Sequence, residues 1–422
     1  MKSSVARFLL ALSACQAFAQ PPATLTIEQA VQEALQNNPG LLAERLGIPV
    51  AQAAVITARL RPNPVVSASS DHLDWLGTGF NQVNQAGPTE TALRVDFPFE
   101  RGHKREYRIE TAGFAQKIAQ ARIADSIRRL RLDVTLACID VMEAKARLNL
   151  ANDNLKALEG VVQLNETRLQ GGAIAPIELT RSRVAMLQFR SSVKTAELSL
   201  ATARIRLQTL LGRGPNGTPV DISDPLKAPV PEAVPSLDQM EARAVMTRPD
   251  LQAVRLDQAR SQAELRLQLA QGKVDYTAGT EYRRQQGVNG TGNMLGFFFS
   301  MPLPVFNRNQ GEIARVTSEQ VQLQKQIEAL QSQVNGEVAG AYREYETART
   351  LIGDIEKDLL GLSEEARTTT NYVYQAGAGS LLEVLDAQRA FNDTMSTYYD
   401  AQADYRRAMS RLASVVGEEV FP

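Results

Sequence analysis

Apolar residues recur at steps of three and four over two long stretches in the first half of the chain. In Lys104–Leu169 they are Leu130, Val134, Ala137, Val141, Leu148, Leu155 and Leu158. In Ile177–Leu211 they are Leu179, Val184, Leu187, Val193, Leu198, Ile205 and Leu210. This spacing places them on one face of an α-helix. The first helix would be on the order of 100 Å long, so we expect coiled coils or a tube of helices rather than a compact globule.

Four shorter runs predict β-strands. In three of them apolar and polar residues alternate with a period of two, and the run from Pro64 alternates poorly. The clearest is ALRVDFPF, which starts at Ala92, and the others start at Pro64, Val274 and Met294. An ordinary half-buried sheet would alternate in the same way. However, aromatic residues such as Trp75 near strand ends are typical of membrane strands. The Gly- and Asn-rich segments 76–88 and 285–293 are predicted to be exposed hairpin loops.

The same series of predicted elements occurs twice along the chain. ALQNNPGLLAERL and AVMTRPDLQAVRL place Pro39 and Pro249 at matching positions, 210 residues apart. Each proline separates a short helix (27–37 or 237–246) from a longer one (41–60 or 251–271). Strands, a very long helix, a Gly-rich turn and another long helix follow. We therefore expect a repeat at 20–212, a Pro-rich connector at 213–236 and a second repeat at 237–422.

The N-terminal segment is predicted to be a signal peptide, residues 1–19. Lys2 and Arg7 precede the short apolar run FLLALSA, and Ala17-Phe18-Ala19 has the pattern of a cleavage site. A second interpretation remains open, because Leu12-Ser13-Ala14-Cys15 resembles a lipoprotein signal that would place a lipid on Cys15. Either interpretation sends the protein out of the cytoplasm.

Composition excludes several classes of function. The net charge is −1, so no general basic field points to nucleic acid. No internal apolar run is judged to reach the roughly 18 residues of a membrane-spanning helix, so a membrane would be crossed by a β-barrel. The two histidines, His72 and His103, lie in no nucleophile motif or metal-ligand cluster. We expect no enzyme, no cofactor, no dedicated metal site and, for Cys138, a buried apolar position.

One motif, taken with the repeat, resembles a known protein family. RLQGGAIAPIEL, from Arg168, is answered by VYQAGAGSLLEV, from Val373. In the second tract a Tyr374-Gln-Ala-Gly377 turn precedes Glu383 and Asp386. Together with the repeat, this resembles the TolC-type outer-membrane efflux protein family, most closely its CzcC-like heavy-metal branch. The resemblance covers essentially the whole mature chain.

The resemblance implies a fold that is mainly α with a small β part. Long antiparallel helical hairpins would form a periplasmic α-barrel. The four strands would join those of two further copies in a twelve-stranded outer-membrane β-barrel. A homotrimer would then act with a periplasmic adaptor protein and an inner-membrane transporter of the RND type, with outer-membrane lipid around its strands.

The expected gate is at the hairpin tips. Glu383 and Asp386 share a helix face, and three copies would form a ring that favours cations and raises neighbouring pKa values. A solvated acidic face near a helix N-terminus is the alternative. Glu178 and Arg181 are the matching positions of the first repeat, and Tyr374 is assigned to the same gate.

The Gly-rich turns are the expected docking tips for the adaptor, at Gly171, Gly172, Gly377 and Gly379. Glycine at a tight helix–helix turn is also required for positive φ alone. Some members of the family place an arginine after the turn, where this chain has Gly379.

The function expected from these features is the passive exit duct of a tripartite efflux pump, exporting cations, heavy metals or small toxic compounds. A duct for drug efflux or type I protein secretion is the alternative. A periplasmic adaptor or a structural coiled-coil protein fits less well, because the chain has two helical hairpins and amphipathic strands.

Overall fold

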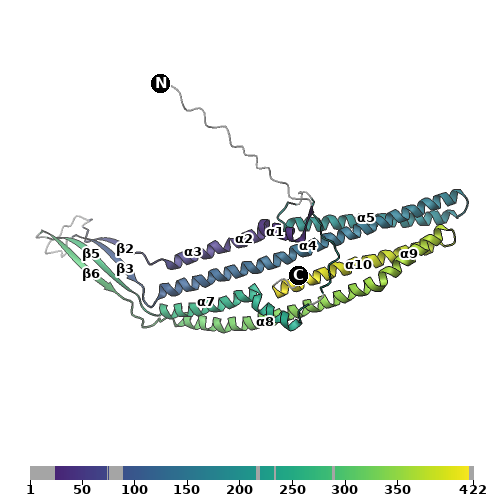
Figure 1. Ribbon diagram of the computed structural model, residues 1–422. Coiled ribbons are helices and arrows are strands. Elements are labelled where there is room, and N and C mark those ends of the chain that lie inside the picture. The colour runs from purple at the N-terminus through teal and green to yellow at the C-terminus, as the bar shows by residue number, and fades with distance from the viewer. Residues whose placement is uncertain are drawn as a thin grey trace, which may run out of the picture. The chain divides into compact units, whose positions relative to one another are not determined.

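The computed structural model describes residues 24–73, 75, 89–214, 219–231, 234–287 and 290–417 (Figure 1). The predicted signal peptide with Cys15, and the loop 76–88, lie outside the described residues. Contacts divide the chain into two compact units, each built from segments of both sequence halves. The first unit has the residues up to Ala34 with Val134–Lys227 and Asp358–Ala403. The second has Leu35–Asp133 and Ala228–Lys357, with the residues from Asp404 onward.

Helices make up most of the described chain. They are α1 (Ile27–Asn37), α2 (Pro39–Arg45), α3 (Gly47–Arg59), α4 (Lys104–Gln170), α5 (Pro176–Leu210), α6 (Leu237–Thr247), α7 (Pro249–Gln271), α8 (Gln310–Asp354), the single π-helical turn η1 (Ile355–Leu359), α9 (Leu360–Gln375) and α10 (Leu381–Val416). The strands are β1 (Thr24–Leu25), β2 (Val65–Asp71), β3 (Glu90–Phe99), β4 (Asp221–Ile222), β5 (Tyr276–Gly287) and β6 (Gly290–Ser300). The predicted long helices at 104–169 and 177–211 are confirmed as α4 and α5.

The predicted single helix 41–60 is wrong, because the chain breaks there into α2 and α3 at Leu46. Asn38 caps α2 by accepting a hydrogen bond from the Leu41 amide at 3.0 Å. Pro49 has no N–H to donate to the carbonyl of Arg45, so the helical ladder is interrupted. The matching residue of the second repeat is Ala259, and α7 continues without a break.

Among the described residues, four strands form an antiparallel sheet in the order β2-β3-β5-β6. The poorly alternating run from Pro64 does form a strand, β2. The predicted loop 285–293 is too long, because β5 extends to Gly287 and β6 starts at Gly290. In this Gly-rich tract β5 and β6 stay paired through their backbones, although the side chains there do not alternate in a way that predicts a strand.

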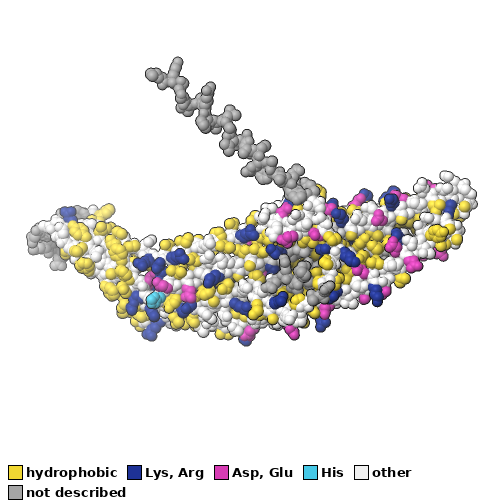
Figure 2. Space-filling model, in the orientation of Figure 1, with side chains coloured by type: hydrophobic (Ala, Val, Ile, Leu, Met, Phe, Trp, Pro, Cys, Tyr) yellow, Lys and Arg dark blue, Asp and Glu magenta, His cyan; other side chains and the backbone are white. Residues whose placement is uncertain are grey.

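The sheet has one charged face and one apolar face. On the charged face, Arg94 pairs with Asp96 at 2.9 Å, and Arg283 pairs with Glu281 and Glu90 at 2.9 and 2.7 Å. On the other face, aromatic rings form a row across three strands. The ring of Tyr276 lies 5.5 Å from that of Phe99 and 5.7 Å from that of Phe299. The predicted alternation is confirmed, and Figure 2 shows hydrophobic side chains gathered over the strands.

One helical stretch among the described residues is long and apolar enough to cross a membrane, which corrects the expectation that no such run exists. It is Pro39–Arg59, with a mean hydropathy of 1.3 over its most apolar window. The break at Leu46 divides it, and the core helix of a soluble protein passes the same test of length and composition. It therefore carries little weight on its own.

The Pro-rich connector 213–236 is not wholly irregular. Its strand β4 pairs in parallel with β1, and the Asp224 carboxylate accepts a hydrogen bond from the Ile27 amide at 2.7 Å. Lys145 of α4 bonds Asp221 at 2.6 Å, and it lowers the pKa of that carboxyl despite the opposing effect of burial. The connector is thus fastened to the start of α1 and to α4 within the first unit.

Cys138 is buried in α4, as expected. Burial raises the pKa of its thiol to about 12, so the reactive thiolate form is suppressed at neutral pH.

Candidate functional site

The two hairpin tips of the first unit are built by the same turn. α4 and α9 each end in a glycine with positive φ, 72° at Gly172 and 82° at Gly377. The Ala173 amide donates to the Arg168 carbonyl at 2.8 Å, and the Ala378 amide donates to the Val373 carbonyl at 3.1 Å. This is the Schellman pattern, which satisfies the last carbonyls of a helix and favours glycine. The expected Gly-rich tips are therefore present as tight, regular turns.

The neighbouring glycines of the turns differ in the space around them. A Cβ on Gly171 would approach nothing closer than 3.6 Å. A Cβ on Gly379 would lie 3.2 Å from Cγ1 of Val373 and 3.3 Å from the Tyr374 nitrogen. These two residues therefore leave little room at position 379 for the arginine that some members of the resembled family place after this turn.

The helices that leave the two tips start in different ways. At the second tip, Ser380 and Glu383 form a capping box. The Glu383 carboxylate accepts from the Ser380 amide at 2.9 Å, and the Ser380 hydroxyl accepts from the Glu383 amide at 3.3 Å. At the first tip the corresponding residues are Ala175, which has no side-chain cap, and Glu178. Arg181, one turn beyond Glu178, is exposed.

The ring hypothesis expects neighbouring carboxylates to raise the pKa of Glu383. Within a single chain this pKa is not raised. The hydrogen bonds from the backbone and side chain of Ser380 instead hold that pKa below its usual range. Asp386 is exposed and lies 3.5 Å from Arg389 in the next turn of α10. Glu383 and Asp386 do lie on exposed positions of one helix, close to the tip.

Tyr374 lies inside the tip rather than on its surface. Its side chain is 2% exposed, and its hydroxyl bonds Asn165 Oδ1 of α4. Arg168 donates to the Tyr374 carbonyl at 2.9 Å, and its guanidinium lies 4.9 Å from the centre of the Tyr374 ring. Tyr374 therefore ties the end of α9 to the end of α4, and its hydroxyl does not face solvent.

An apolar cluster and a polar layer hold the two hairpins together. The cluster consists of Leu158, Val161, Ala185, Tyr374, Leu381, Val384 and Leu385. Farther from the tip, Asn154 of α4 bonds Gln388 and Asn392 of α10, each at 2.7 Å. Arg147 of α4 pairs with Asp400 of α10.

Sequence reasoning did not single out Asn154, Asn165 or Arg168. A signal was present for Asn165, because it follows Leu158 by seven residues and so falls on the apolar face of α4. A buried polar residue at such a position needs a hydrogen-bonding partner. The Nδ2 of Asn165 is buried without one, whereas its Oδ1 accepts from Tyr374.

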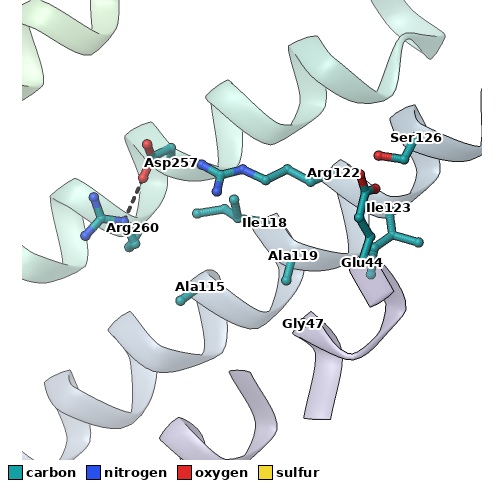
Figure 3. A pocket seen from close by; sticks show the side chains of 10 residues that line it. All are labelled: Glu44, Gly47, Ala115, Ile118, Ala119, Arg122, Ile123, Ser126, Asp257 and Arg260. Carbon is teal, nitrogen blue, oxygen red and sulfur yellow. Dashed lines mark hydrogen bonds and ion pairs between the residues drawn. The ribbon is translucent and has the colours of Figure 1, made fainter. Parts of the chain in front are cut away.

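One depression in the second unit has no arrangement of side chains typical of a reaction site. It has a volume of about 630 Å³ and is lined by parts of α2, α3, α4 and α7 (Figure 3). Arg260 pairs there with Asp257 at 2.7 Å, and Ala115, Ala119 and Gly47 line much of the rest. Within the described ranges, no group of three or more His, Cys, Asp or Glu residues could hold a metal ion.

Comparisons with known proteins bear on the whole chain. The cobalt-zinc-cadmium resistance protein CzcC of Cupriavidus metallidurans is 25% identical over 395 residues, covering 93% of this chain and 90% of the relative. The pyoverdine export outer membrane protein OpmQ of Pseudomonas putida is 23% identical, covering 95% and 87%.

Among solved structures, CusC, described as forming a transmembrane channel, superposes with a TM-score of 0.75 at 20% identity. The match covers 95% of this chain and 96% of that one, and at this identity it supports the fold alone. The model of the family described as outer membrane efflux protein matches residues 30–213 and 242–418. These matches take in both hairpins and both strand pairs, and the chain belongs to the outer membrane efflux protein family.

Proposed function

We propose that this protein is the passive exit duct of a tripartite efflux pump and that it works as a homotrimer. The observation that carries the proposal is the described sheet, which has one apolar and one charged face and ends in the unpaired edges of β2 and β6. Lipid does not tolerate unpaired backbone edges. Pairing β2 of one copy with β6 of the next removes them, and three copies give twelve strands.

The cargo proposed is a cation or heavy metal, with small toxic compounds as the wider class. The resemblance to a cobalt-zinc-cadmium resistance protein supports it. The resemblance to a pyoverdine export protein favours the second candidate, a duct for small organic molecules, and type I secretion is a further alternative. In each case the chain performs no covalent step, and energy comes from an inner-membrane transporter of the RND type.

The hairpin tips are the proposed gate. Three copies of Glu383 and Asp386 would surround one aperture and favour cations. Only one carboxylate oxygen of Glu383 is bonded within the capping box, so its charge remains exposed to solvent. Glu178 and Arg181 of the first tip would alternate with them around the ring. Tyr374 contributes by holding the tip closed from inside.

The ring is tested by current measurements on the full-length protein in planar bilayers. Glu383→Gln with Asp386→Asn removes both charges, while Gln can still accept the hydrogen bond of the capping box. We expect the permeability ratio of potassium to chloride to fall several-fold at low salt. The change should shrink in 1 M salt, where the screening length is about 3 Å.

Asp393→Asn is the matched control, because Asp393 is exposed on the same helix but lies about two to three turns beyond Glu383 and Asp386. It should leave the ratio unchanged. An unaltered ratio in the double variant would contradict the ring, whereas absence of any channel would contradict the duct itself.

Gly171, Gly172, Gly377 and Gly379 are proposed as the surface on which a periplasmic adaptor protein docks. Small residues at the tip let another backbone approach closely.

For the N-terminus we keep the proposal of a signal peptide at 1–19, with lipidation of Cys15 as the alternative. Intact mass of the mature protein distinguishes the two.

A further inference from the structure

Cationic side chains form a band where the strands of the four-stranded sheet join the helices. This basic band holds eight Lys or Arg residues against three carboxylates, within segments 59–61, 100–108 and 273–275 and at position 308. A Cβ on Gly102 would lie 2.8 Å from Cδ of Lys273, so these segments are in contact. All of them belong to the second unit. Figure 2 shows dark blue side chains gathered where the strands give way to the helices.

Two of the three carboxylates in the basic band are already bonded to cations. The Asp275 carboxylate accepts from the Lys104 ammonium at 2.7 Å, and Glu100 pairs with Arg108. These bonds fasten the turn between β3 and α4 to the start of β5. Of the three, only the exposed Glu106 is left to offset the remaining cations. The band therefore keeps a local excess of positive charge, although the chain as a whole is almost neutral.

A depression of about 490 Å³ opens in the basic band, on the apolar face of the sheet. Its lining includes the rings of Phe97, Phe99 and Tyr276, which belong to that face. The same lining includes Arg61, which precedes β2, and Arg105 of the first turn of α4. The depression thus combines aromatic rings with two guanidinium groups.

The two arginines have N–H groups available for a ligand. Arg61 is exposed, and its guanidinium has no hydrogen bond or ion pair to another residue in the described ranges. Arg105 donates from Nε to the Arg59 carbonyl at 2.7 Å, which leaves its two terminal nitrogens without a partner in the described part of the chain. A guanidinium matches the geometry of phosphate oxygens through paired N–H groups. The depression therefore suits a phosphate group.

Exposed apolar side chains lie beside this cationic site. Leu60, between two arginines, is 61% exposed. After β6, the segment 301–306 exposes Leu303, Val305 and Phe306 by 63% or more. Apolar and aromatic groups next to Lys and Arg are typical of a protein surface at the level of lipid headgroups. A free phosphate ion would satisfy the arginines but leave the aromatic rings in water, whereas a phospholipid would cover both.

We propose that the depression binds an anionic phospholipid of the periplasmic leaflet, with Arg61 and Arg105 on its phosphate and Phe97 and Phe99 against the start of an acyl chain. The proposal rests on the proposed duct, which places the strands in the outer membrane and the helices in the periplasm. The helix-side ends of the strands then lie level with the headgroups of that leaflet. Each copy supplies the whole lining, so a trimer binds three lipids.

The test is native mass spectrometry of the full-length protein, delipidated in detergent and mixed with phosphatidylglycerol or phosphatidylethanolamine. The first lipid is anionic, whereas the ammonium of the second neutralises its own phosphate. We expect the parent to retain phosphatidylglycerol several-fold more strongly. Arg61→Gln with Arg105→Gln should lower the affinity for it by about tenfold or more, since each basic residue near anionic lipid contributes about fivefold.

Two further variants separate loss of the site from misfolding and from general charge effects. Arg61→Gln alone removes no bond within the described chain, so it should fold like the parent and still lose about fivefold in affinity. Arg190→Gln with Arg343→Gln is the matched control. It removes the same charge from exposed helical positions outside the depression, and it should retain phosphatidylglycerol like the parent.

Equal retention of the two lipids, or equal retention by the parent and the Arg61–Arg105 double variant, would overturn the proposal. The bound lipid should withstand millimolar inorganic phosphate. Displacement by it would show that the site binds free phosphate, which also overturns the assignment.

The mass of the particle reports separately on the duct. Trimers without a preference for phosphatidylglycerol would overturn the lipid site alone. Monomers that keep the preference would overturn the trimeric duct and leave the lipid site standing, because one chain supplies its whole lining.

Discussion

The side chain of Tyr374 links the two hairpins of the first unit through its bond to Asn165. Tyr374→Phe would remove the hydroxyl that Asn165 accepts from, and Asn165 Nδ2 already lacks a partner. A buried acceptor left unpaired costs about 1–3 kcal/mol. We expect faster hydrogen exchange at the ends of α4 and α9 and a larger resting current through the channel.

The double variant Tyr374→Phe with Asn165→Leu is the control, because replacing both partners by apolar groups removes the unpaired atoms. Exchange protection should recover in it. A Tyr374→Phe variant that exchanges like the parent would contradict the assigned bond. The motif singled out Tyr374 in advance, but the sequence alone could not show that its ring turns inward.

The N-terminal caps of α5 and α10 can be compared directly, because only α10 has a side-chain cap. Ser380→Ala would remove the hydroxyl of the capping box, a loss of about 1 kcal/mol, and should speed amide exchange at Glu383 about fivefold. Ala175→Ser would supply the missing cap at the first tip and should slow exchange at Glu178. Equal exchange in parent and variant at both tips would show that the caps do not hold these helix starts.

The same cap predicts a dependence on pH. Because the pKa of Glu383 is lowered in the folded chain, its contribution is present above the ordinary value near 4.5 and is lost as the pH falls through the folded value. Protection of the second tip should therefore weaken in acid. In the Glu383→Gln variant it should stay constant over the same pH range.

Elements with strong periodic contrast could be predicted from the sequence, and those without it could not. α1 begins and ends at the predicted residues Ile27 and Asn37. The break between α2 and α3 was missed because Pro49 lies in an otherwise apolar helical stretch. β2 alternates poorly, since Ser67, Ser69 and Ser70 are small and polar on both faces, and only pairing with β3 makes it a strand.

The candidate site shows the same limit. The Gly-rich tips and the acidic pair could be predicted from residue type and spacing. The partners of Tyr374 could not, because Asn165 and Arg168 lie more than 200 positions away in the sequence. The Ser380–Glu383 capping box had a local signal, serine followed by glutamate three residues later, which the expected ring of carboxylates obscured.

At the scale of the whole molecule, the faces of the sheet determine which side meets lipid. Leu295 lies on the apolar face with Tyr282, whereas its neighbour Met294 pairs with Arg283 on the charged face. Leu295→Glu should cost on the order of 1–2 kcal/mol per chain in the bilayer, repeated three times in a trimer. Met294→Glu should be tolerated, since it faces water and gains an arginine across the strand.

The measurement is the fraction of each variant that reaches the outer membrane as a heat-modifiable trimer. The two substitutions introduce the same side chain at adjacent positions, so propensity and net charge are matched, and only the face differs. We expect Leu295→Glu to accumulate unassembled in the periplasm while Met294→Glu assembles like the parent. Equal assembly would mean that the apolar face is not the one in contact with lipid. The closure of β2 on β6 between copies would then have to be abandoned, because that closure assigns the charged face to the lumen.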